Sequence, residues 1–147
     1  MLRIPSTTPR RDAEDAFKAI LDAAQLGVPV FRDRPPEGVP VPSVVQTLAG
    51  GNSRSGAIGL QESETQRALE EHYRIQIDCY HDDKVECDLL ADQVEQAIVD
   101  HEDALRSTYG IEHVKKLDDA DVSSSNELSR EYRVRMDFGF TAYRAVS

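Results

Sequence analysis

The sequence predicts an α+β domain: an antiparallel or mixed sheet of about four to five strands with two main amphipathic helices on one face. Two stretches, Tyr73–Tyr80 and Tyr132–Tyr143, alternate apolar and polar side chains with the period of a half-buried strand. Between them, Lys84–Tyr109 repeats apolar side chains with the spacing of an amphipathic helix. The chain has 147 residues, which fits a single domain over 1–147 with a core of its own.

The N-terminal part of the chain predicts one helix and two short strands. The helix is expected over Pro9–Gln25, because Thr8 suits the N-cap and proline suits the first helical position. Gly27 is expected to end this helix. Val28–Phe31 predicts a short strand, and Ser43–Leu48 predicts a second strand after a loop rich in proline.

A flexible loop or arm is predicted at about 49–71. Ala49–Gly59 is rich in glycine, serine and asparagine, a composition typical of loops. Leu60–Glu71 has few apolar residues, so a short helix, a hairpin and an irregular arm all stay open as interpretations.

The central helix is expected to begin with a capping box. Asp83 would accept hydrogen bonds from the first helical amides, and Glu86 would bond back to the cap. Gly110 is placed to end the helix after about six turns. The predicted apolar stripe consists of Val85, Leu89, Leu90, Val94, Ala97, Ile98, His101 and Leu105. Beyond it, Ile111–Leu117 predicts an edge strand, and Asp118–Asn126 predicts a solvated turn.

The sheet is expected to turn a polar face away from the helices. This face carries charges of both signs, so that arginine and aspartate can pair between neighbouring strands, and either water or a second subunit would cover it. Its residues are Arg74, Gln76, Asp78, Arg133, Arg135, Asp137 and Thr141.

The charge balance argues against duplex DNA or an anionic membrane as a partner. The formal net charge is -10, with 27 acidic and 17 basic residues, whereas both partners require a basic surface. No stretch of the sequence has the length of a membrane span or the pattern of a signal peptide, so folding in a cytoplasm is expected.

The acidic composition also fits a protein that works in high salt, although an ordinary acidic protein stays an equal alternative. Arginine outnumbers lysine 13 to 4, and 15 of the acids are aspartate. Salt screens the self-repulsion of such a chain, so for a halophilic protein we expect the melting temperature to rise with KCl concentration. A melting temperature that falls as KCl approaches molar levels would exclude this interpretation.

The sequence predicts no catalytic, cofactor or metal site. The one group that resembles a site is Cys79, His81, Asp83 and Cys87, and its spacing matches no regular zinc pattern. Cys79 is in phase with the buried face, where a free cysteine acts as a small apolar side chain. The chain lacks a Gly-x-Ser-x-Gly elbow and the lysine of a phosphate-binding loop, so we expect no enzyme activity.

Several stretches together resemble tail completion (tail terminator) proteins of long-tailed bacteriophages. Val30–Val45 is similar to that family in having a strand, an acidic proline-rich loop and a second strand. Tyr73–Tyr80 resembles the next strand, Leu89–Ile98 the following helix, and Glu131–Ala142 the closing strand. The resemblance covers most of the chain and follows element order rather than any single motif.

The resemblance implies a structural virion protein of a siphovirus-like bacteriophage or haloarchaeal virus. Such proteins form a ring, usually a hexamer, that ends the tail tube and joins the tail to the head–neck complex. The implied partners are other copies of the chain, the tail tube protein and the head–neck connector protein, while genome DNA passes through the channel without specific binding. The implied location is the tail or neck of the virion, with assembly in the host cytoplasm.

The subunit interface is predicted at arginines, because the planar guanidinium makes bidentate pairs across interfaces. The predicted interface residues are Arg32, Arg34, Arg54, Arg67, Arg74, Arg133 and Arg135. Three alternatives remain: a head-completion or neck connector protein of the same virion, a monomeric cellular interaction module that binds a peptide at a sheet edge, and a small metal-dependent enzyme built on the cysteine–histidine group.

Overall fold

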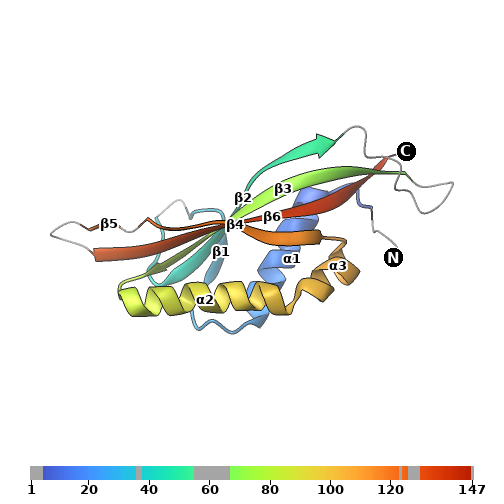
Figure 1. Ribbon diagram of the computed structural model, residues 1–147. Coiled ribbons are helices and arrows are strands. Elements are labelled where there is room, and N and C mark those ends of the chain that lie inside the picture. Colours follow the sequence, from blue (N-terminus) through green and yellow to red (C-terminus); the bar gives the residue numbers. More distant parts are fainter. Residues whose placement is uncertain (1–4, 36–37, 55–66, 123, 126–129, 147) are drawn as a thin grey trace.

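A twisted sheet forms one layer of the molecule and three helices form the other (Figure 1). The computed structural model describes residues 5–35, 38–54, 67–122, 124–125 and 130–146. In chain order the elements are α1 (Pro9–Ala23), β1 (Val30–Arg32), β2 (Ser43–Arg54), β3 (Arg67–His81), α2 (Lys84–Asp100), α3 (Glu102–Tyr109), β4 (Glu112–Asp121), β5 (Ser124–Ser125) and β6 (Arg130–Val146).

The sheet is mixed, with the main strand order β1-β2-β3-β6-β4, and β5 pairs with β6 beside this path. Only β1 and β2 are parallel among the described strands, and the other neighbours are antiparallel. The centre is the β3–β6 pair, whose register runs from Arg67 opposite Val146 to His81 opposite Tyr132. This arrangement confirms the predicted α+β class and the helices on one face of the sheet.

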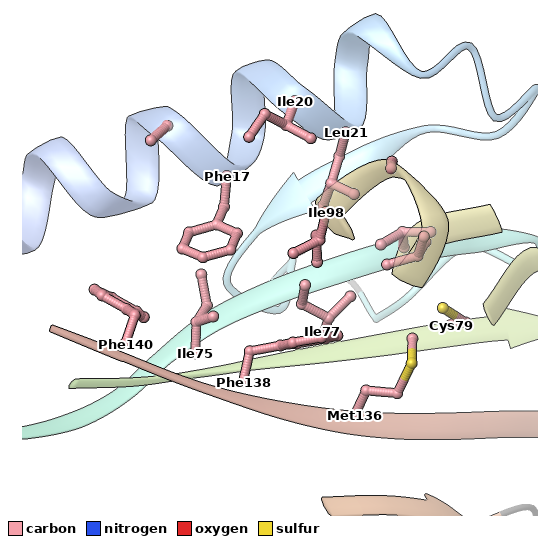
Figure 2. Packing of buried hydrophobic residues seen from close by; sticks show 14 of the residues in the cluster. Phe17, Ile20, Leu21, Ile75, Ile77, Cys79, Ile98, Met136, Phe138 and Phe140 are labelled. Atoms are coloured by element: carbon pink, nitrogen blue, oxygen red, sulfur yellow. The ribbon is translucent and has the colours of Figure 1, made fainter. Parts of the chain in front are cut away.

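The core lies between the sheet and the helices. In Figure 2, Phe17 and Leu21 of α1 point toward the sheet, and Ile75, Ile77 and Phe138 point back at them. The exposed fraction of Phe17, Ile75 and Ile77 is 0%. Burying each such side chain contributes about 1.5–3 kcal/mol, so the alternating strands that supply them hold the domain together.

The first helix begins at Pro9 as predicted, but its C-terminal end and its capping differ from the prediction. It ends at Ala23 rather than Gln25, and Gln25 adopts a positive φ of 53°. The Thr8 side chain makes no bond to the helix amides; its hydroxyl instead bonds to an Asp12 carboxylate oxygen at 3.1 Å. Pro9 does occupy the first turn, as the sequence predicts.

The prediction of one long central helix is wrong. The helical stretch breaks at His101 and forms two helices, α2 and α3. At this residue φ is -109° and ψ is 17°, outside the helical range, and the imidazole Nδ1 lies 2.7 Å from the Ala97 carbonyl oxygen. Leu105 beyond the break is fully buried, so the change of direction lets α3 continue to cover the sheet. Gly110 ends α3 with a left-handed φ of 69°, as predicted.

The start of α2 confirms half of the predicted capping box. An Asp83 carboxylate oxygen accepts hydrogen bonds from the amides of Val85 and Glu86 at 2.8 and 3.2 Å. The Asp83 amide, however, donates to His81 Nδ1 at 3.1 Å. The sequence predicts the Glu86 side chain as the acceptor of this bond. Val85 and Leu89 are not part of the buried stripe, since they are 65% and 49% exposed.

The strands are longer than the sequence predicts. Ala49–Arg54 continues β2 and Arg67–Glu71 begins β3, where a loop or arm was expected; residues 55–66 of that arm lie outside the described residues. Asp118–Asp121, expected in a solvated turn, belongs to β4. This edge strand pairs with β6 irregularly, because its register shifts twice along its length.

Candidate subunit interface

The face of the sheet that the helices leave open carries the polar residues that the sequence places there. We call this the outer face. The strand register puts Gln76 opposite Asp137 and Asp78 opposite Arg135, while the alternate residues of β3 and β6 enter the core. The residues of the outer face are Arg74, Gln76, Asp78, Arg133, Arg135, Asp137 and Thr141.

Asp78 is the centre of the first charge cluster on this face. Its carboxylate accepts hydrogen bonds from Arg133 and Arg135, each through Nε at 3.2 Å, and from the Gln76 amide at 2.9 Å. Arg133 also lies over the ring of Tyr80, with its guanidinium carbon 5.1 Å from the ring centroid. Asp78 is 3% exposed although none of the described helices covers this face, because the long side chains around it lie across the sheet surface.

Arg74 and Asp137 form the second charge pair, with the guanidinium 2.6 Å from a carboxylate oxygen. The Arg74 side chain is 55% exposed and the Asp137 side chain 9%. The second oxygen of Asp137 is buried and has no hydrogen-bond partner among the residues that the structure describes. The outer face is therefore a mostly prearranged polar surface, with the Arg74 guanidinium exposed at its centre.

Three of the arginines predicted at an interface, Arg74, Arg133 and Arg135, share the outer face. Arg32 lies at the β1 edge and pairs with Asp15 of α1 at 2.5 Å, away from the other three. Arg34 is exposed in the loop after β1. Arg54 and Arg67 lie in β2 and β3, and their side chains fall outside the described part of the structure. Their role at an interface stays a prediction.

A hollow of about 600 Å³ also opens on the outer face, and sequence reasoning missed it. Arg74 lines it and lies between two glycines in the strand register, Gly50 of β2 on one side and Gly139 of β6 on the other. A glycine inside a strand pattern marks an irregularity of the strand or a close approach of another group to its backbone. These two glycines were the signal in the sequence that could have indicated the hollow. The hollow is lined by Gly50, Glu70, His72, Tyr73, Arg74, His113, Lys115, Leu117, Gly139, Phe140 and Thr141.

The cysteine–histidine group has a structural explanation. Cys79 and Cys87 are buried free thiols, and the Cys87 Sγ lies 3.4 Å from the Cys79 carbonyl oxygen, to which it donates. Burial, and next the proximity of Cys87, raises the pKa of the Cys79 thiol, as expected of a cysteine that packs as a small apolar side chain. His81 and Asp83 take part in the cap of α2. The described residues contain no cluster of three or more potential metal ligands.

Comparisons with known proteins yield likenesses among solved structures. No protein-family model matches the chain, and no curated protein matches it. A chain from a structure titled "Virion of native gene transfer agent (GTA) particle" is similar, with a TM-score of 0.42 and 15% identity. The similarity covers 86% of this chain and 84% of that one. No helix in the described residues is long and apolar enough to cross a membrane.

Proposed function

We propose that this chain is a structural virion protein that forms a ring, ends a tail tube and joins the tail to the head–neck complex. The observation that carries the proposal is the outer face of the sheet, which is charged, uncovered and held in place by its own ion pairs. Asp78 and Asp137 are 3% and 6% exposed there, although no helix lies over them. A prearranged surface loses little side-chain entropy when a partner covers it.

The long strands support the same proposal. Figure 1 shows the β2–β3 pair running past the helices at one end of the sheet, and β6 with β5 running past them at the other. Strands that extend beyond the core offer contact surface to neighbouring molecules without disturbing the packing of the domain. This geometry suits a subunit that meets several partners at once.

In the proposed assembly the subunits meet head to tail, so each interface joins two different surfaces of the chain. A rotation that closes on itself limits such an assembly to a fixed number of copies, which we propose is six. One side of the ring binds the tail tube protein and the other binds the head–neck connector protein. Genome DNA passes through the acidic channel without specific binding, because like charges repel. The chain has no enzyme activity, cofactor or membrane partner in this proposal.

The mass of the purified protein in solution tests the ring directly. We expect light scattering to give the mass of about six copies of the 16.4 kDa chain. Electron microscopy should then show the ring at the ends of purified tail tubes. Rings found instead on portal-capped heads would identify a neck connector. A protein that stays monomeric at all concentrations and binds neither structure would overturn the proposal.

A further inference from the structure

The hollow on the outer face gathers several hydrogen-bond donors, of which Arg74 already pairs with Asp137 at 2.6 Å and keeps its side chain 55% exposed. His72 and Arg74 of β3 line one side, and His113 and Lys115 of β4 line the other. Glu70, whose carboxylate lies 3.6 Å from His72 Nε2, is the only carboxylate among the described residues of the lining. The hollow is therefore a donor-rich place on a chain whose formal net charge is -10.

Two of these donors have no partner in the described structure. Lys115 is exposed, and no carboxylate in the described ranges pairs with it, unlike its neighbour Lys116, which bonds to Glu95 and Asp119 at 2.9 Å each. His113 is also exposed and adopts a left-handed φ of 57° at the first irregularity of β4. The β4 edge thus presents two free basic side chains beside the hollow.

The opposite side of the molecule carries the complementary charge. Helices α2 and α3 lie below the sheet in Figure 1 and cover its inner face. Most residues that line the hollow belong instead to the outer face or to the β4 edge. The 84–109 stretch of the two helices contains one lysine, one arginine and one histidine, namely Lys84, Arg106 and His101. Its acidic residues, most of them exposed, are Glu86, Asp88, Asp92, Glu95, Asp100, Glu102 and Asp103. We call these the acidic helix surface.

We propose that the hollow binds carboxylate side chains from the acidic helix surface of a second copy of this chain. A head-to-tail contact needs two different and complementary surfaces on one subunit, and here a donor-rich hollow and an acidic surface lie on opposite sides of the sheet. Arg74, exposed between its two glycines, and Lys115 at the strand edge make charge-assisted hydrogen bonds to the incoming carboxylates. This inference rests on the proposed ring and names the surfaces that build it.

Reversing the charge of Lys115 tests the hollow. Lys115 is exposed on an edge strand, so Lys115→Glu should leave the monomer folded, with an unchanged circular dichroism spectrum. We expect the variant to dissociate into monomers at concentrations at least tenfold above those at which the wild-type ring persists. Arg11→Glu makes the same change of charge at an exposed residue of α1, and it should keep the wild-type mass.

A mixing experiment tests the pairing of the two surfaces. Asp92→Lys/Asp100→Lys reverses two exposed charges of the acidic helix surface, and we expect this variant alone to be monomeric. This variant keeps an intact hollow, which can accept the intact acidic surface of Lys115→Glu subunits. The mixture of the two variants should therefore form complexes that neither variant forms alone.

The outcomes separate this inference from the proposed function. If the wild-type protein and the Lys115→Glu variant both form rings, the hollow is not the interface. The proposed ring itself would not be contradicted by that result. Monomeric variants whose mixture stays monomeric would overturn the pairing with the acidic helix surface. A monomeric wild-type protein would overturn the proposed function and this inference with it.

Discussion

Replacing Met136 with aspartate is expected to unfold the domain. Met136 lies on β6 at 1% exposure, and Figure 2 shows its side chain on the helix side of the sheet near Cys79. The change removes a packed side chain, which costs about 2–5 kcal/mol in a core. It also buries a carboxylate without a cationic partner, which costs several kcal/mol more. The sum is comparable to the ~5–15 kcal/mol that stabilises an ordinary domain.

Circular dichroism and thermal melting measure this effect. We expect Met136→Asp to lose the cooperative melting transition of the wild-type protein. Met136→Leu is the matched control, because it keeps the volume and the apolar character, and it should cost less than about 1.5 kcal/mol. An aspartate variant that melts cooperatively near the wild-type temperature would contradict the burial of this side chain.

Removing the carboxylate of Asp78 is expected to give the second largest loss of stability. Two guanidinium groups and one amide donate to this carboxylate, so Asp78→Ala leaves three donors without their acceptor. Breaking a fully buried ion pair costs about 3–5 kcal/mol. Arg133 and Arg135 are 24% and 36% exposed, so water can solvate them in part, and we expect about 2–3 kcal/mol.

This loss should appear as a fall in the melting temperature of about 5–10 °C for a domain of this size. Asp92→Ala is the control, since Asp92 is exposed on α2 and should change the stability by less than about 0.5 kcal/mol. Equal melting temperatures for the two variants would mean that the Asp78 cluster contributes nothing to the stability of the sheet.

The central strands and the side on which the helices pack could be predicted because their patterns are long. β3 and β6 alternate over many residues, so a wrong register would place a whole row of apolar side chains in water. The same alternation correctly placed Arg74, Arg133 and Arg135 together on the outer face. The two-residue alternation of a strand, followed over the length of β3 and β6, is sufficient to predict which side chains share a face.

The parts that could not be predicted depend on contacts between distant residues. The break at His101 leaves the apolar spacing intact, so the sequence pattern continues through it. Asp118–Asp121 resembles a turn in composition, yet pairing with β6 holds it in a strand. The hollow likewise needs β2, β4 and β6 to meet around Arg74, and no local pattern encodes that meeting.

The two edges of the sheet limit how this protein can grow into larger structures. β1 pairs over only three residues and is followed by Asp33 with a left-handed φ of 59°, while β4 is irregular and carries a row of aspartates. Short, bent and charged edges discourage the backbone pairing that leads to fibrils. In the proposed ring, copies of the chain therefore recognise one another through side chains, and the shape of the subunit sets their number.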